Sequence, residues 1–409
     1  MRVAVIGGGV AGLSAAWELL RSGAEPVVFE AGKRAGGKVG SVREGPWLTE
    51  DGPHFIAQPM DSLLDVAGLQ GALLEPQPPK TRWVWLGNQR LRAPSLGLLQ
   101  QLGLPRALLE PLFARPLEGD TSLRAFLVQR LGVRAGELLS TLMASGVYAG
   151  DPARLSARSA FPSLAQGSLL LRRRRRSPLW SLREGLGSLP LALAARLGAR
   201  VRLNAKVSAL VPSTAGWLVD GDGFDAVVLA VPSSVAATLV PRLAEALGKL
   251  RSAPVALVHL GFPARELPRG FGLLDASSSL RFVGALLPSS MLPGRAPEGS
   301  ALLTAICGGA RHPEIARLPD AQLIEAVRED VKRTLGASSE PQYQRVVRYS
   351  EAIPQYEVGH EERVQAVRAL LLELPRLELA GAAYDGVSVP DVARSGARAA
   401  ARLQSPRSW

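Results

Sequence analysis

Residues 3–38 read VAVIGGGVAGLSAAWELLRSGAEPVVFEAGKRAGGK, and this stretch decides the expected fold. The apolar run Val3–Ile6 is typical of a short buried strand, and the Ala- and Leu-rich segment that ends near Gly23 is typical of a helix. Val27–Phe29 is a second run of strand type. A strand, a glycine turn, a helix and a second strand in this order predict a parallel β-α-β unit of Rossmann type.

The turn between the first strand and the helix has glycines in G-x-G-x-x-G spacing, at Gly7, Gly9 and Gly12. In a dinucleotide site the first glycine permits the tight turn, the second lets the backbone approach a pyrophosphate, and the third lets the helix pack on the strand. The phosphates then lie at the helix N-terminus, where free N–H groups favour negative charge. Glu30 follows the last glycine by 18 residues, where an acid would accept hydrogen bonds from ribose hydroxyls. The order of these parts predicts a dinucleotide site rather than a structural turn.

The residues after this acid extend the pattern. Glu30, Arg34, Gly36 and Gly37 form E-x-x-x-R-x-G-G, which resembles flavoproteins of the amine-oxidase superfamily, where FAD is held along its length. A nicotinamide dehydrogenase needs no such extension, so the resemblance favours FAD over NAD. Lys38 stands where that family usually has an arginine, and it keeps the charge. The cofactor-binding residues expected here are Gly7, Gly8, Gly9, Val10, Ala11, Gly12, Glu30, Ala31, Arg34, Gly37 and Lys38.

Composition places the chain among globular proteins with more than one domain. It has 409 residues, 47% of them hydrophobic and 21% charged. No run of about 18 apolar residues occurs, and no basic stretch precedes an apolar one at the start, so we expect no membrane span, no signal peptide and a cytoplasmic location. A single cysteine, Cys307, excludes an internal disulfide and a Cys-rich metal site, and the four histidines show no ligand spacing. We therefore expect no metal.

The net charge of +12 comes mostly from arginine. Nucleic acid is one explanation, but aromatic content is only 5% and no recognition motif occurs, so we expect no nucleic-acid partner. An anionic phospholipid, an anionic substrate or Arg-rich codon usage explains the charge as well. The five adjacent arginines Arg172–Arg176 repel one another and predict a solvated loop. Contact with an anionic membrane, at roughly 1 kcal/mol per charge, is the functional alternative.

The pattern of apolar residues changes along the chain, and these changes predict three domains. Leucines at helical spacing in the middle of the chain indicate short helices. Strand-like runs at Trp83–Leu86 and between residues 241 and 350 indicate a sheet, with one helix at Ala321–Leu335. The fold class is thus α/β (α+β), and the resemblance implies a Rossmann-like FAD-binding domain of the p-hydroxybenzoate-hydroxylase and amine-oxidase type. The predicted FAD-binding domain comprises residues 1–60, 178–240 and 366–409, the mixed-sheet substrate-binding domain residues 61–88 and 241–365, and the small helical domain residues 89–177.

Several later blocks resemble one branch of this superfamily, the oxygen-dependent protoporphyrinogen oxidase family. These blocks follow the family's order and extend the resemblance over nearly the whole chain. They are Ser145–Ser156 (SGVYAGDPARLS) with Phe161-Pro162, Gly308–Arg311 (GGAR), Ala352–Tyr356 (AIPQY) with Gly359-His360, and Gly386–Asp391 (GVSVPD).

This resemblance implies a chemistry. The substrate would be protoporphyrinogen IX, and flavin N5 would take a hydride from a bridging carbon while a pyrrole N–H proton is lost. Three such two-electron rounds would give protoporphyrin IX, a late step of haem biosynthesis, and dioxygen would reoxidise the flavin with formation of peroxide. The cofactor carries this chemistry, so we identify no catalytic side chain.

The resemblance also assigns further cofactor residues. Residues 52–55 pass the isoalloxazine ring, Val207 bonds adenine through its backbone, and Tyr349 stands where the family usually has Trp against the flavin. A helix that begins near Pro390 would direct its positive end at the negative charge of the reduced flavin. These further residues are Gly52, Pro53, His54, Phe55, Val207, Tyr349, Gly381, Val387, Ser388 and Val389.

Two positions are expected to contact the substrate. Gly146 matches a family glycine beside the macrocycle, where the absence of a Cβ permits close approach. The substrate carboxylates need a cation, which family members supply from a segment that aligns poorly here. We assign it to Arg92, with Arg90 in reserve, and a solvated surface arginine is the alternative for both.

Several rival functions remain open at this level. Coproporphyrinogen III oxidation would use the same fold with more basic residues in the pocket. An amine oxidase would often tether its flavin through a C-terminal cysteine, which the segment 381–384 lacks. A carotenoid-desaturase-like enzyme would lack the block at Ser145–Ser156, and a flavin or porphyrin carrier would show no turnover. The sequence does not decide between a monomer and a homodimer.

Overall fold

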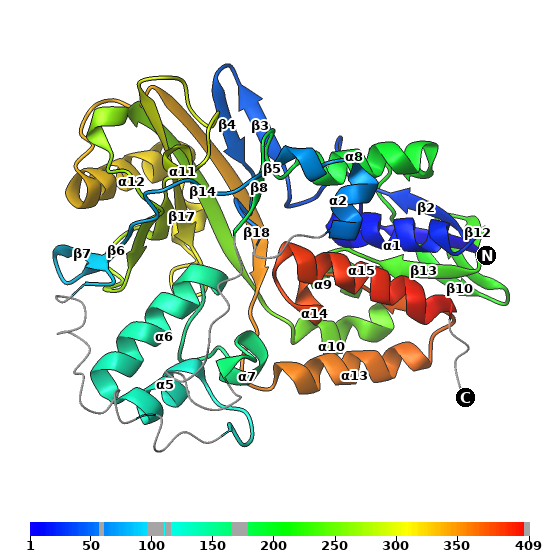
Figure 1. Cartoon of the computed structure of the whole chain (residues 1–409). Coiled ribbons are helices and arrows are strands. Elements are labelled where there is room, and N and C mark those ends of the chain that lie inside the picture. Colours follow the sequence, from blue (N-terminus) through cyan, green and yellow to red (C-terminus); the bar gives the residue numbers. More distant parts are fainter. Residues whose placement is uncertain (57–60, 96–109, 111–115, 165–178, 405–409) are drawn as a thin grey trace.

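The computed structural model describes residues 1–56, 61–95, 110, 116–164 and 179–404 (Figure 1). Its amino-terminal half-domain is built on a five-stranded parallel sheet with strand order β19-β13-β1-β2-β9. Val3, Val5 and all of β13 are buried, as expected of parallel strands that are covered on both faces. The strands are β1 (Arg2–Ile6), β2 (Glu25–Phe29), β9 (Val201–Arg202), β13 (Ala226–Leu229) and β19 (Leu377–Leu379).

Helices cover both faces of this sheet. One core joins it to α1 (Val10–Arg21), α8 (Ser188–Leu197) and α15 (Val389–Gln404). The core on the other face contains α9 (Ser233–Leu239), α10 (Ala244–Gly248) and α13 (His360–Leu372). A three-stranded antiparallel sheet, β10 (Leu210–Ser213), β11 (Gly216–Val219) and β12 (Asp222–Phe224), lies beside it.

The second half is a seven-stranded mixed sheet with strand order β18-β14-β17-β16-β15-β6-β7. One face packs on α12 (Asp320–Leu335) through alternate side chains such as Ala256, Val258 and Leu260. The opposite face carries Val255 and Leu257 and belongs to a smaller apolar cluster. The strands are β6 (Arg82–Leu86), β7 (Gln89–Ala93), β14 (Ser252–Pro263), β15 (Gly272–Asp275), β16 (Phe282–Leu286), β17 (Ser300–Gly308) and β18 (Tyr343–Pro354).

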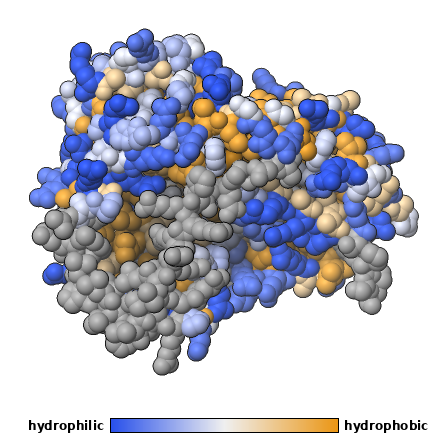
Figure 2. Space-filling model, viewed as in Figure 1, coloured by the Kyte–Doolittle hydropathy of each residue, from blue (hydrophilic) through white to orange (hydrophobic). Residues whose placement is uncertain are grey.

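A helical layer lies against this second face. α6 (Val133–Tyr148) packs beside α5 (Leu123–Leu131) and contacts β15 and β16, below the large sheet in Figure 1. Figure 2 shows some hydrophobic surface in this part of the molecule. On α6, Val133 and Val147 are exposed. Within the described residues, no helix is long and apolar enough to cross a membrane.

Shorter elements join these layers. They are β3 (Ser41–Glu44), β4 (Trp47–Glu50), α2 (Asp61–Ala67), β5 (Leu73–Leu74), α7 (Ala157–Ala160), β8 (Ser181–Leu182), α11 (Pro288–Met291) and α14 (Ala382–Asp385). β3 and β4 form a hairpin, and β5 pairs with β8.

The predicted fold class is confirmed by this architecture, but two local expectations differ. Residues 89–93, assigned to the helical domain, form the edge strand β7 of the large sheet. Residues 241–250 and α13 pack in a core of the nucleotide-binding half, not on the large sheet. The arginine run Arg172–Arg176 lies outside the described residues.

Candidate functional site

The glycine turn at the carboxyl end of β1 has the geometry that its spacing predicts. Gly7 has φ +105°, in the region that favours glycine, and an added Cβ at Gly12 would come closer than 3.0 Å to Gly7 O. These two positions need glycine for the turn and for close helix packing. Gly9 differs, because a Cβ there would meet nothing within 4 Å. The turn therefore opens onto free space at the position where a pyrophosphate would lie.

Glu30 lies directly beside this turn. Its Oε2 accepts a hydrogen bond from Gly8 N at 2.7 Å, and its Oε1 accepts one from Gly32 N at 2.7 Å. The backbone of Ala205 donates to Glu30 O at 2.8 Å and brings the buried Val207 loop to the same edge. The carboxylate is thus fixed at the end of β2, where it would hold the ribose of a dinucleotide.

The second glycine pair continues the groove. Gly36 N donates to Gly8 O at 2.8 Å, and an added Cβ at Gly37 would lie 3.3 Å from Gly9 Cα. Arg34 Nη2 donates to Asp51 Oδ2 at 2.6 Å. Glycines at both turns let two backbone segments lie in contact, and the arginine joins the loop to β4.

Lys38 connects the groove to the large sheet. Its Nζ donates to Ala352 O at 2.8 Å and also to Glu351 O, both in β18. Burial lowers the pKa of this amine. The charges of Lys38 and Arg34 are therefore engaged with protein groups that shape the groove.

Asp51 joins the two halves of the molecule, and the sequence analysis missed this role. Besides Arg34, it accepts a hydrogen bond at 2.6 Å from Arg345 of β18, which also donates to Thr49 at 3.0 Å. The Asp51 side chain is only 6% exposed. A buried carboxylate between two guanidinium groups fixes the hairpin β3-β4 against the sheet.

His54 points into the large sheet. Gly52 O can only accept, so His54 Nδ1 donates to it (3.3 Å), and Nε2 accepts from Thr304 Oγ1 at 3.2 Å. His259 Nδ1 lies 2.9 Å from the same hydroxyl. Burial is the main cause that lowers the pKa of His54 to about 4, so the ring is neutral at pH 7. Its ring nitrogens are engaged with protein, and only its backbone is free to face a cofactor.

Three other predicted cofactor residues are Pro53, Phe55 and Tyr349. Pro53 is half-buried, and Phe55 stacks on Phe271 with ring centroids 5.4 Å apart. Tyr349 pairs with Val255 in the β14-β18 ladder, so it shares the sheet face of the smaller apolar cluster. Burial raises the pKa of its hydroxyl.

The C-terminal helix begins at the same edge as α1. An added Cβ at Gly396 would come closer than 3.0 Å to Ala11 O, and Gln404 bonds Ser22, so α15 runs parallel to α1. Both helix N-termini therefore lie on one side of the sheet, and their dipoles favour negative charge there. Gly381 also faces open space.

The turn before this helix is held by side chains. Gly386 has φ +118°, and its N–H donates to Tyr356 Oη at 2.7 Å. Ser388 Oγ donates a hydrogen bond to the carboxylate of Asp391, and this side-chain bond caps the first turn of α15. Val387 and Val389 flank this serine, and their side chains pack in two different apolar clusters.

The two expected substrate contacts lie on opposite faces of the large sheet. An added Cβ at Gly146 would lie 3.7 Å from Leu274, whose face continues through Gly284 and Ile306 to Leu257. Arg92 instead pairs with Trp83, which packs in the core under α12.

Arg90 also lies on the α12 side, where it donates to Thr334 O at 3.3 Å. Arg92 and Arg90 therefore lie on the face of the large sheet opposite to the face that Gly146 contacts. The alternation of side chains along β7 directs both arginines to the other face.

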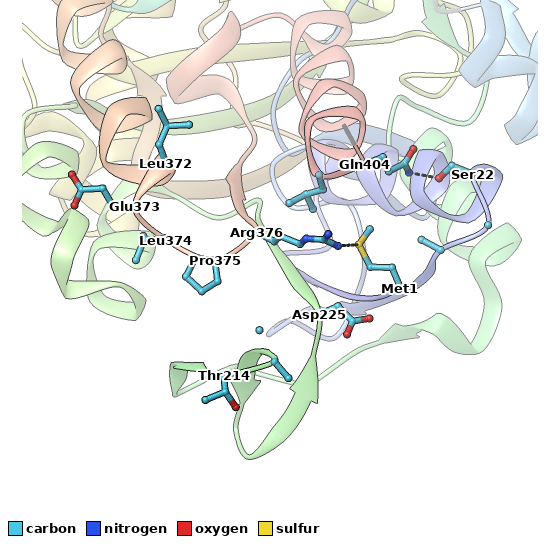
Figure 3. Close-up of a pocket in the computed structure, with 15 residues that line it drawn as sticks. Met1, Ser22, Thr214, Asp225, Leu372, Glu373, Leu374, Pro375, Arg376 and Gln404 are labelled. Carbon is cyan, nitrogen blue, oxygen red and sulfur yellow. Dashed lines mark hydrogen bonds between the residues drawn. The ribbon is translucent and has the colours of Figure 1, made fainter. Parts of the chain in front are cut away.

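A groove of about 1050 Å³ lies elsewhere, at the amino end of the parallel strands (Figure 3). Met1, Asp225 and Arg376 directly precede β1, β13 and β19. Ligands of open parallel sheets bind at the carboxyl ends of the strands, so this groove is not the cofactor site.

The parallel sheet, the glycine turn, the Glu30 carboxylate beside it and the paired helix N-termini have the geometry of a dinucleotide-binding site. The family model for flavin-containing amine oxidoreductases matches residues 10–404, and the chain belongs to this family. The residues at the groove fit FAD, which is the cofactor.

Relatives with known names cover nearly all of the chain. It is 31% identical to the protoporphyrinogen oxidase of Homo sapiens over 467 aligned residues, covering 97% of each protein. It is 29% identical to the coproporphyrinogen III oxidase of Bacillus subtilis, covering 95% of each. A crystal structure from Exiguobacterium sp. 255-15, provisionally named a protoporphyrinogen oxidase, superimposes with a TM-score of 0.87 at 25% identity over 98% of both chains.

Proposed function

We propose that this chain is an FAD-dependent oxidase that converts protoporphyrinogen IX to protoporphyrin IX with dioxygen, in haem biosynthesis. The observation that carries the proposal is a juxtaposition. The dinucleotide groove ends beside an apolar face of the large sheet, and Gly146 of α6 lies over that face. The printed names of the relatives point to the same substrate class.

The apolar face suits a large flat macrocycle. Val255, Leu257 and Val283 form its floor, and Ile306 and Val347 are partly exposed beside them. Burial of apolar area is worth about 25 cal/mol per Å², so a tetrapyrrole would gain affinity by covering the partly exposed Ile306 and Val347. Gly146 would allow the macrocycle to approach the backbone of α6.

The chain's own groups would bind and orient. Glu30 would hold the ribose, the turn at Gly9 the pyrophosphate, and the start of α15 the negative end of the flavin. Bound FAD supplies the redox chemistry, which removes a hydride and a proton from the porphyrinogen in each of three rounds. Three molecules of dioxygen are consumed and three of hydrogen peroxide are formed. Because the ring nitrogens of His54 are engaged, we assign no catalytic side chain.

Coproporphyrinogen III is the second candidate substrate, because the Bacillus subtilis relative with 95% mutual coverage bears that name. Parallel turnover assays of the purified holoenzyme with both porphyrinogens test the proposal. We expect peroxide and a fluorescent porphyrin from protoporphyrinogen IX at the higher kcat/KM. A preference for coproporphyrinogen III would reassign the substrate. Product from neither would refute the function.

We further propose that this chain is cytoplasmic and binds to the surface of anionic membranes. The net charge of +12 supports this proposal. Sedimentation with vesicles tests it: binding to phosphatidylglycerol vesicles, but not to phosphatidylcholine vesicles, is expected. Gel filtration with light scattering would decide between a monomer and a homodimer.

A further inference from the structure

The block Gly308–Arg311 lies against the end of α6. An added Cβ at Gly309 would come closer than 3.0 Å to Ala149 O, and Ala310 N donates to the same oxygen at 2.8 Å. Ile306, two residues before the block, belongs to the apolar face. The backbone thus places Arg311 at the rim of that face, beside the helix end that carries Gly146.

The Arg311 guanidinium is held by neutral groups. Its Nη2 donates to Ser145 Oγ at 3.1 Å, and its Nη1 donates to Ser278 Oγ. Ser145 directly precedes Gly146 and is only 5% exposed, whereas Ser278 lies in the loop between β15 and β16. Two hydroxyls from different elements therefore fix the orientation of one half-buried cation.

The nearby carboxylates Asp275 and Asp151 attract this cation, but neither forms an ion pair with it. Asp275 accepts from Ser277 N at 2.8 Å and from Leu280 N at 2.9 Å, and Asp151 accepts from Ala153 N at 2.9 Å. Within the described part of the chain, Arg311 has no carboxylate within 4.0 Å. Burial is the main cause that lowers its pKa, as expected of a cation without a close counter-charge.

Three other arginines in this half of the molecule are already paired. Arg345 bonds Asp51, Arg295 lies 3.5 Å from Glu50 in a fully buried pair, and Arg281 lies 3.7 Å from Asp330. A partly buried guanidinium that holds only hydroxyls is suited to an anionic ligand, because its planar donors match a carboxylate.

We propose that Arg311 binds a carboxylate side chain of the tetrapyrrole, in place of the arginines of β7. This inference rests on the proposed function and adds its carboxylate-recognising residue. Ser145 and Ser278 would position the guanidinium, and Gly146 would leave room for the ring beside it.

The test compares binding of protoporphyrin IX and of its dimethyl ester to the holoenzyme by fluorescence titration. The ester lacks the negative charges but keeps the ring. We expect wild type to bind the acid more tightly, and Arg311→Gln to lose about 10-fold or more for the acid while binding the ester as before. Arg281→Gln, a matched arginine with a protein partner on the α12 side, should change neither.

Three results would overturn the inference: an unchanged acid preference in Arg311→Gln, equal loss of acid and ester, or loss of the preference in Arg92→Gln instead. If Arg311→Gln does not retain flavin, Arg311→Lys answers the question, because lysine keeps the charge without the planar fork. Its preference should fall only in part, and an unchanged preference would contradict the inference. If one of these results is obtained and the wild-type protein still oxidises porphyrinogen, only the inference about Arg311 fails. If the wild-type protein neither oxidises nor binds porphyrinogen, the proposed function fails too.

Discussion

Alanine substitutions at Gly9 and Gly12 should separate the effect on FAD binding from the effect on the stability of the folded protein. Gly9 has φ −74° and ψ 179°, which any residue adopts, and an added Cβ meets nothing within 4 Å. Gly9→Ala should therefore keep the free protein as stable as wild type, or stabilise it by about 0.4–1 kcal/mol. The methyl group would occupy the space of the pyrophosphate, so overpacking of about 1–3 kcal/mol should weaken FAD about 5- to 150-fold.

Gly12→Ala should instead destabilise the free protein. Its Cβ would come closer than 3.0 Å to Gly7 O, a backbone atom of the turn, so the free protein itself should lose stability. The assays are calorimetric titration of flavin-free protein with FAD and urea unfolding of the same protein. Wild-type FAD affinity in Gly9→Ala would refute the assignment of the cofactor to this turn.

Four further predictions follow from individual contacts. Glu30→Ala should yield colourless protein on purification, because the ribose acid and two backbone contacts are lost; full flavin content would contradict this. His54→Asn should remove one part of the pH dependence of the unfolding free energy. The pKa of His54 is about 4 in the folded protein and 6.5 in the unfolded chain. The contribution of His54 to stability is therefore complete above pH 6.5 and falls by roughly 3 kcal/mol toward pH 4. Burial raises the pKa of Glu50 to about 7, which gives an opposite slope between pH 4.5 and 7, so the measured quantity is the difference in unfolding free energy between wild type and the His54 variant. Asp51→Asn should cost about 3–5 kcal/mol in urea unfolding, because two guanidinium groups lose their shared counter-charge; a change below 1 kcal/mol would refute the junction role. Gly146→Leu should retain flavin and fold but lower kcat/KM for porphyrinogen at least 10-fold, and an unchanged value would exclude this helix end from the substrate site.

The first β-α-β unit was predictable because its signals are local. The glycine spacing sets the turn, and the expected strands Val3–Ile6 and Val27–Phe29 form within β1 and β2. The choice of FAD is confirmed by the family of the chain, and it came from the short extension after Glu30. These features lie within 40 residues of one another in sequence.

Long-range packing explains what the sequence did not reveal. Residues 241–250 and α13 are amphipathic, but only the folded chain shows which core they join. The edge strand β7 follows a turn at Gly87-Asn88, where Gly87 has φ +63°; this hairpin signal was present but went unused.

The proposed carboxylate-binding arginine, Arg311, was not identified from the sequence for a similar reason. Side chains alternate along a strand, so the register of β7 against β6 decides which face Arg92 occupies. Arg311 lies in a block that was recognised as a motif, but its contact with Ser145 joins positions 166 residues apart. Such a contact is visible only once α6 and β17 are placed together.

Anaerobic mixing of the purified, flavin-loaded protein with protoporphyrinogen IX tests the central claim most directly. We predict rapid loss of the visible flavin absorbance, followed on admission of air by its return together with porphyrin fluorescence and peroxide. A flavin that stays oxidised with both protoporphyrinogen IX and coproporphyrinogen III would contradict the account.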